Sequence, residues 1–284
     1  MSIDIDLRKD YSLLLKNELH LLGVEIDINI PIDEIPCIYF NHIKRKIYPK
    51  PRRILKSDSF ICPPELLLGL GNLENKIISG ENLTPHLSKL VYIDYKFRDY
   101  MLNDWGIFHL HLGINMTDGF VDRTDPVLFC IVREETVYFI AMKHHGEWTD
   151  KSLLSIVYSN WSDLLKPFIL PGVLSTTSNP TNEDIGKCRK GNVMLILEIA
   201  PGVVIAPPGG GYMTDGTSRE VVTKKNNTMR RLSYLEDKIK ANERNIRKRI
   251  ISENKTPAKK LKFKLQIKDD TIFVYEIYSK MFFS

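Results

Sequence analysis

The sequence has few cysteines, and their spacing argues against two kinds of small site. Cys37, Cys62, Cys130 and Cys188 lie far apart and form no CxxC pair. The pattern therefore indicates neither a zinc knuckle nor a dithiol redox motif. We expect reduced thiols that are mostly buried.

Long apolar runs are also lacking. No stretch reaches the roughly 18 to 20 apolar residues that a membrane span needs. The first 22 residues alternate charged and apolar side chains and have no small-residue cleavage site, which argues against a secretory signal. We therefore predict a cytoplasmic protein with no membrane partner.

The composition excludes two further classes. With 43% hydrophobic and 26% charged residues, the chain has the balance of an ordinary globular protein rather than of a disordered or fibrous one. Its 284 residues suffice for a core that needs no disulfide or metal support.

Charge, in contrast, is present and unevenly spread. Residues 219–264 contain 16 Lys or Arg and 5 Asp or Glu, a net charge of +11. The rest of the chain has 24 basic and 30 acidic residues, a net charge of −6. Such asymmetry suggests a binding surface.

The basic segment predicts a long helix that begins after Ser218, a plausible N-cap, and runs to about Glu253. Its apolar residues form a narrow stripe, which leaves much of the basic surface in water. The candidate phosphate contacts are Lys224, Lys225, Arg230, Arg231, Arg247, Lys248 and Arg249. Phosphate contact gives affinity without sequence choice. We predict a nucleic acid partner, with an acidic protein partner or inhibitor as the alternative.

Strands and helices occur in runs, without strict strand-helix alternation. Residues 106–113, 127–132 and 136–144 read as one antiparallel sheet with a hairpin at Glu134 and Glu135. Helical spacing marks 7–22, 63–78, 89–103 and 153–165, while 24–30, 193–200 and 203–206 read as strands and 42–56 as a loop or edge strand. The chain closes with a hairpin around Asp269 and Asp270.

These elements predict an α+β fold: a central small antiparallel sheet with flanking helices, a long basic C-terminal helix and a terminal β-hairpin. We expect three regions. Residues 1–100 form an N-terminal α+β region, residues 101–217 contain the histidine-bearing sheet, and residues 218–284 hold the basic helix and the hairpin.

Two histidine pairs fall within the predicted sheet. His109 and His111 are two residues apart in a strand, so both project from the same face. His144 and His145 follow another strand, whose end can bring one of them close. Imidazoles titrate near neutral pH, so a pair supplies both the base and the acid of a proton-transfer reaction.

Cationic and aromatic residues surround these pairs. Arg123 and Lys143 are candidates for charge stabilisation, and Trp148 or Trp161 for stacking on an unpaired base. Such a set suits metal-independent cleavage of RNA, in which one histidine deprotonates the 2′-hydroxyl and another protonates the leaving oxygen. Only RNA supplies that nucleophile, so we expect RNA rather than DNA and no cofactor.

Other interpretations stay open. In one alternative, His109 and His111 occupy the solvent-facing side of a strand whose Phe108, Leu110 and Leu112 fill the core. In another, His144 and His145 lie in a solvated loop after their strand. A third histidine could instead complete a zinc site with an open position for water. Asp99 and Asp104 either orient a histidine or serve as capping and surface residues.

The small sheet with histidines on its strands, within residues 100–170, is similar in outline to compact metal-independent ribonucleases, including bacterial toxin nucleases of the barnase, RelE and EndoU kinds. The likeness is one of fold and assigns no residue a role. We predict a toxin-like or defence-like ribonuclease. The alternatives are a non-catalytic nucleic-acid-binding or complex-forming protein with structural histidines, and a zinc-dependent hydrolase.

Overall fold

The computed structural model describes residues 3–268 and 271–283. The chain divides into two compact units. Asn41–Val221 form one, here called the inserted unit, and Met1–Phe40 with Val222–Ser284 form the other, here called the split unit. The chain is an α+β protein, as predicted.

The inserted unit is built on a four-stranded sheet with the order β2-β7-β6-β3. The strands are β2 (Arg53–Lys56), β3 (Phe108–Leu110), β6 (Val127–Val132) and β7 (Thr136–Lys143). β3, β6 and β7 are antiparallel neighbours, and β6 and β7 form the predicted hairpin. β2 pairs parallel to β7 and makes the edge strand that the proline-containing segment allowed.

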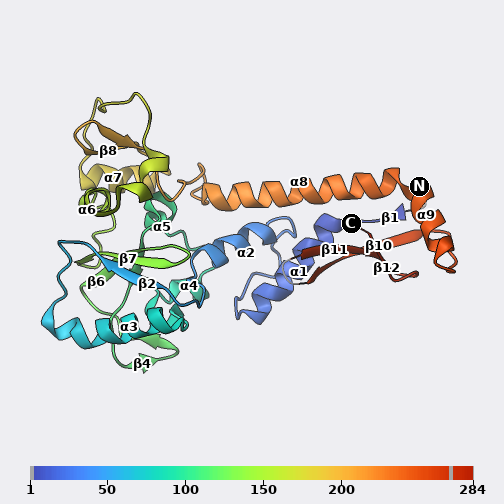
Figure 1. The fold of residues 1–284 in the computed structure, drawn as a ribbon, viewed down its shortest axis with the longest axis horizontal. Helices are drawn as coiled ribbons and strands as arrows, with labels where there is room; N and C mark the ends of the chain where they lie inside the picture. Colours follow the sequence, from blue (N-terminus) through green and yellow to red (C-terminus); the bar gives the residue numbers. More distant parts are fainter. Residues whose placement is uncertain (1–2, 269–270, 284) are drawn as a thin grey trace. The chain divides into compact units, whose positions relative to one another are not determined.

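Helices cover both faces of this sheet (Figure 1). On one face, Phe129 and Ile131 pack with Leu153 and Val157 from α6 (Ser152–Trp161). On the other, Leu128, Cys130 and Phe139 pack with residues of α3 (Leu67–Ser79). Alternation along a strand sends neighbouring side chains into two different cores. The predicted solvent-facing side therefore does not exist on this sheet.

The remaining elements of the inserted unit are short. The helices are α4 (Leu90–Ile93), α5 (Tyr100–Trp105), α7 (Asn182–Lys190) and the 3-10 turns at Pro64–Leu66, Thr84–His86, Ser162–Leu164 and Lys166–Phe168. Two small hairpins pair β4 (Met116–Thr117) with β5 (Phe120–Val121) and β8 (Leu197–Ala200) with β9 (Val203–Ile205).

One helix prediction is wrong in this unit, and one helix was not predicted. Residues 89–103 do not form one helix, because the Asp94 carboxylate accepts the Lys96 backbone N–H (2.8 Å) and holds a turn between α4 and α5. Such local side-chain bonds compete with helix formation. α7 was not predicted, although Thr181 and Asp184 form a capping box at its start.

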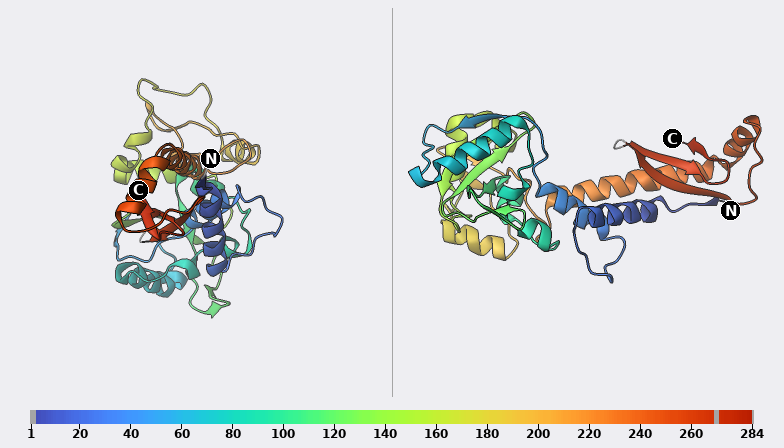
Figure 2. Two further views of the ribbon diagram at one scale, coloured as in Figure 1. Left: turned by 90° about the vertical axis from the view of Figure 1, so that its right-hand side faces the viewer. Right: turned by 90° about the horizontal axis from the view of Figure 1, so that it is seen from below.

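The split unit combines helices with a second four-stranded sheet of order β1-β10-β11-β12. Its elements are α1 (Leu7–Leu21), α9 (Glu243–Ser252), β1 (Ile3–Asp4), β10 (Leu261–Lys268), β11 (Thr271–Glu276) and β12 (Met281–Phe283). α2 (Ile35–Lys44) and α8 (Arg219–Ala241) cross the boundary between the units. Figure 2 shows α8 running beside the sheet within this unit.

Several predictions fall in the split unit. β10 and β11 are antiparallel, as predicted, but the turn at Asp269 and Asp270 lies outside the described residues. The basic helix is interrupted at Asn242, so α8 and α9 replace one continuous helix. Residues 24–30 form turns rather than a strand. Alternating residues become a strand only beside a partner strand, and in the described part of the chain this segment pairs with none.

The two units divide the chain differently from the three predicted regions. β2 belongs to the first predicted region and β7 to the second, yet they share one sheet. β1 likewise joins β10 across nearly the whole sequence. Pairing between segments far apart in sequence is not visible in local patterns, which explains the difference. No described helix has the length and apolar character needed to cross a bilayer.

Candidate active site

The end of β3 positions the first two imidazoles. His109 pairs with Phe129 on β6, and His111 follows directly after the strand. Their ring centroids are 6.2 Å apart. Both side chains leave the sheet on the α6 side, where His109 is half-buried and His111 is only 2% exposed.

The connection from β7 to α6 brings a third imidazole. The backbone N–H of His145 donates to the Asp125 carboxylate (2.7 Å), which fixes this loop against the segment before β6. The His145 ring centroid is then 6.3 Å from that of His109 and 5.9 Å from that of His111. Trp148 closes the group, with ring centroids 4.5 Å from His109 and 4.7 Å from His145. We call His109, His111 and His145 the imidazole cluster.

A cation and a backbone amide set the tautomers of two of these rings. Nη2 of Arg123 lies 2.6 Å from Nε2 of His145. Because a guanidinium only donates, Nε2 accepts and the neutral His145 ring carries its proton on Nδ1. The backbone N–H of Thr124 donates to Nδ1 of His111 (3.1 Å), so neutral His111 carries its proton on Nε2.

The third ring is less constrained. Within the described residues, neither ring nitrogen of His109 makes a hydrogen bond. Nε2 of His111 is buried and also lacks a hydrogen-bond partner there. Buried polar atoms are normally hydrogen-bonded, so an orphaned N–H beside a cation and two imidazoles suggests a bound group. His145 and Arg123 are exposed, which leaves the cluster open to solvent on their side.

Burial and mutual repulsion disfavour protonation of the cluster. Burial lowers the pKa of His109 to about 4, and the charges of His145 and Arg123 act in the same direction. The pKa of His111 is also lowered to about 4. Burial is the largest cause, and the charges of His109 and Arg123 act in the same direction. Burial and Arg123 also lower the pKa of His145, against the opposing effect of Asp125. The free protein therefore holds neutral imidazoles next to one permanent cation.

Hydrogen bonds from outside the cluster fix the His111 backbone. His111 donates its backbone N–H to the His86 carbonyl (2.9 Å), and Nδ1 of His86 donates to the His111 carbonyl (2.8 Å). The Thr124 hydroxyl accepts the backbone N–H of Leu112 (3.1 Å). These contacts hold the end of β3 in place although it lies at the edge of the sheet.

A buried ion pair supports Trp148. Arg189 on α7 pairs with Asp104 (2.9 Å), stacks on the Trp105 ring at 4.1 Å, and donates to the Trp148 carbonyl. Asp104 therefore fixes the tryptophan loop through Arg189, and does not contact a histidine as one interpretation had it. Asp99 caps α5 by accepting the Leu102 N–H (2.9 Å), which agrees with its predicted capping role.

Other predicted site residues point elsewhere. Lys143 pairs with Asp150 (2.7 Å) rather than with the cluster. The His144 ring is exposed, with Nδ1 3.3 Å from the Asp125 carboxylate. Trp161 packs against Tyr138 at 5.0 Å between ring centroids. The structure therefore brings together His109, His111, His145, Arg123 and Trp148.

Sequence reasoning missed Thr124, His86 and Arg189. Thr124 and His86 each contact the His111 segment through one backbone group and one side-chain group. The fold sets these pairings, and no local sequence pattern indicates them. Arg189 lies in a helix that was itself missed. In the sequence it stands beside Lys187 and Lys190, and nothing marks it as the basic residue that is buried.

The basic residues of the split unit differ in their engagement. Arg247 pairs with Glu243 (2.9 Å) and donates to the carbonyls of Ala258 and Lys259, which ties α9 to the strand that follows. Lys224 lies over the Phe40 ring and Arg249 over the Phe283 ring. Arg230, Arg231 and Lys248 are exposed, and Lys225 is half-buried.

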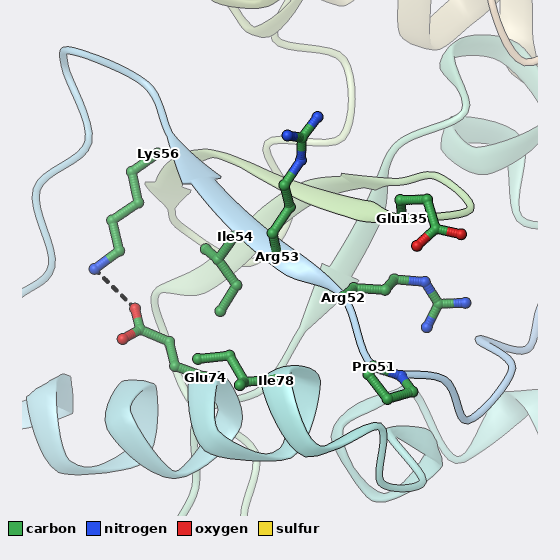
Figure 3. Close-up of a pocket in the computed structure, with 8 residues that line it drawn as sticks. All are labelled: Pro51, Arg52, Arg53, Ile54, Lys56, Glu74, Ile78 and Glu135. Carbon is green, nitrogen blue, oxygen red and sulfur yellow. Dashed lines mark ion pairs between the residues drawn. The ribbon is translucent and has the colours of Figure 1, made fainter.

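A cavity of about 910 Å³ in the inserted unit lies away from the cluster. Figure 3 shows it between the edge strand β2 and α3, where Lys56 reaches across to Glu74 (2.8 Å). Arg53 donates to the Thr136 hydroxyl and Arg52 to three backbone carbonyls. Its polar groups thus bind other parts of the inserted unit, and none of its lining residues belongs to the imidazole cluster.

Among the described residues, no group of three or more His, Cys, Asp or Glu is arranged to hold a metal ion. Comparison with models of known protein families, with curated proteins and with solved structures finds no match to this chain. The geometry around the imidazole cluster is therefore the basis for inferring a function.

Proposed function

We propose that this chain is a metal-independent ribonuclease that works through the imidazole cluster. The observation that carries the proposal is the convergence of three imidazoles, with ring centroids within 6.3 Å of one another, around the guanidinium of Arg123. A phosphodiester is the anionic group that such a set of donors fits.

The fixed tautomers suggest separate roles. His109, whose ring nitrogens are unconstrained, takes the proton of the ribose 2′-hydroxyl as general base. The 2′-oxygen attacks phosphorus and the bond to the 5′-oxygen breaks, which leaves a 2′,3′-cyclic phosphate. The imidazolium form of His145 protonates the departing 5′-oxygen. Arg123 and the Nε2–H of His111 donate to the phosphorane oxygens, where negative charge develops.

Substrate binding itself supplies the acid. In the free protein, burial and Arg123 lower the pKa of His145. A bound phosphodiester brings a negative charge that pairs with Arg123 and favours the imidazolium. Protonation of His145 is then coupled to substrate binding, so the acid forms when the scissile phosphate is in place.

The direct test uses an end-labelled single-stranded RNA incubated with the purified protein, with and without EDTA. We expect cleavage in both conditions and cyclic phosphate ends. An oligonucleotide with a single 2′-deoxy residue should resist cleavage at that residue alone. His109→Ala should lower kcat by roughly 10²- to 10⁴-fold, and Arg123→Ala by roughly 10²- to 10³-fold. His20→Ala, an exposed histidine on α1, is the matched control and should cleave like the wild type.

Three results would overturn the proposal. Intact RNA combined with salt-sensitive binding points to a non-catalytic nucleic-acid-binding protein. Cleavage that EDTA abolishes and Zn²⁺ restores points to a zinc-dependent hydrolase. Cleavage by His109→Ala at the wild-type rate removes the imidazole cluster from the reaction.

A further inference from the structure

The sheet of the split unit has two chemically different faces. Leu261, Phe263 and Leu265 of β10, Val274 of β11 and Phe283 of β12 are buried on one of them. Side chains alternate along a strand, so the residues between them belong to the opposite face. On that outer face β10 carries Lys262, Lys264, Gln266 and Lys268, β11 carries Phe273 and Tyr275, and β12 carries Phe282.

The three aromatic rings of the outer face form one group. Tyr275 lies opposite Phe282 in the register of β11 and β12. Ring centroids are 6.0 Å apart for Tyr275 and Phe282, and 5.9 Å apart for Phe273 and Phe282. Phe273 is 36% exposed and Phe282 is 52% exposed. Exposed apolar side chains that gather in one patch can mark an interaction site.

Lysines run along the side of this aromatic group. Lys264 of β10 lies opposite Tyr275 of β11, and Gln266 lies opposite Phe273. Each ring of β11 therefore has a polar side chain of β10 beside it. Lys264 also pairs with Asp10 of α1, whereas Lys268 is exposed beyond it. The outer face therefore offers flat apolar rings beside positive charge, a combination that suits stacked bases joined by phosphates.

We propose that this outer face binds single-stranded nucleic acid, with bases stacked on Phe273, Tyr275 and Phe282 and with phosphates beside the lysines of β10. A duplex hides its base faces and cannot use the rings. An acidic protein would use the lysines but gain nothing specific from the exposed rings. This surface is separate from the imidazole cluster, and the inference does not depend on catalysis.

The test measures binding to a fluorescein-labelled 12-nucleotide 2′-O-methyl RNA by anisotropy. The 2′-O-methyl group blocks attack by the 2′-oxygen, so the result is independent of the proposed cleavage. We expect Phe282→Leu to weaken binding roughly 5- to 150-fold, because the ring is lost while most apolar area remains. Phe282→Tyr keeps the ring and should bind like the wild type. Neither change should alter the affinity for a duplex of the same sequence.

Salt dependence tests the role of the lysines. For single strands, the slope of log K against log salt changes by about 0.7 for each phosphate contact. Lys262→Ala with Lys268→Ala should reduce the slope, whereas Lys16→Ala on α1 serves as the matched control and should not. Circular dichroism and thermal unfolding establish that each variant is folded.

Several results would overturn the inference. One is binding of single strands by the folded Phe273→Leu/Phe282→Leu double variant as tightly as by the wild type. Another is a wild type that binds no single strand at all. A third is a change in the sedimentation of the same double variant without a change in RNA affinity, which would make the outer face a contact between two copies of the chain.

Discussion

The tautomers of His111 and His145 decide which atoms the cluster presents to a ligand. Thr124 occupies Nδ1 of His111 and Arg123 occupies Nε2 of His145, so each neutral ring offers a donor on its other nitrogen. A neutral imidazole held in this way is a good hydrogen-bond donor and a poor base at the same atom. His109 is therefore the proposed base, an assignment that the sequence spacing of His109 and His111 could not supply.

The buried histidines make the stability of the inserted unit depend on pH. Burial lowers the pKa values of His42, His109 and His111 to about 4 each. Between about pH 4 and pH 6.5 the unfolded chain binds more protons at these sites than the folded chain does. Stability is therefore complete above pH 6.5 and falls as the pH falls. Between pH 7.5 and pH 5 we expect a loss of about 2 kcal/mol per histidine.

Urea unfolding at several pH values measures this effect. His111→Asn should flatten the slope of unfolding free energy against pH, because it removes one of the three sites. His20→Asn, on the surface of α1, is the matched control and should keep the full slope. An unchanged slope in His111→Asn would contradict a buried, neutral His111.

Among the elements, α3 packs directly against the segment that follows His111. A Cβ at Gly69 would overlap the Leu112 carbonyl oxygen, whereas a Cβ at Gly71, two residues along the same helix, would meet nothing within 4 Å. Gly69→Ala must move a backbone segment, and we expect it to lower the free energy of unfolding by roughly 1 to 3 kcal/mol. Gly71→Ala should raise it by roughly 0.5 to 1 kcal/mol through better helix propensity. Equal effects in denaturant unfolding would exclude this close contact.

The ion pair between α5 and α7 gives a second prediction for an element. Asp104 and Arg189 are buried together, and removal of one partner leaves the other charge unpaired. Asp104→Ala should therefore cost roughly 3 to 5 kcal/mol. Glu183→Ala removes the exposed Glu183–Lys187 pair on the same α7 helix and should cost less than about 0.5 kcal/mol. Chemical denaturation compares the two, and a similar loss in both would mean that the buried pair adds nothing.

Local patterns predicted some elements and not others. The alternation and apolar runs of β3, β6 and β7 identified the strands, because each is long enough or hydrophobic enough to stand out. The residues 24–30 carry a similar alternation without a neighbouring strand, and they form no strand.

The imidazole cluster was likewise predictable only in the part that depends on local sequence. The shared face of His109 and His111 is a local property, whereas the approach of His145 depends on how the loop after β7 is held by Asp125.

For the whole molecule, the imidazole cluster and the proposed binding surfaces lie in different units. The imidazole cluster belongs to the inserted unit, and both the basic helix residues and the outer face belong to the split unit. Charge alone indicated a polyanion partner, but it did not indicate that acidic residues of the split unit, such as Asp10 and Glu243, already pair with part of the basic segment.

This separation predicts that binding and turnover respond to different substitutions. Arg230→Ala with Arg231→Ala should raise KM and weaken binding of the 2′-O-methyl RNA, with little change in kcat. His109→Ala should lower kcat and leave the affinity for that RNA unchanged. Steady-state kinetics beside anisotropy distinguishes these cases, and a loss of kcat in the arginine variant would contradict separate roles.

The division of the chain also sets an order of events on the ribosome. The inserted unit is complete once residue 221 has emerged, whereas the split unit still lacks most of α8, all of α9 and three of the strands of its sheet. Domains fold as units during synthesis, and about 60 further residues take roughly 3 to 12 s at the usual elongation rates. During that interval α1 lacks β10, the strand against which it packs. The nascent chain would thus hold a folded imidazole cluster before the outer face, the proposed binding surface for single strands, exists.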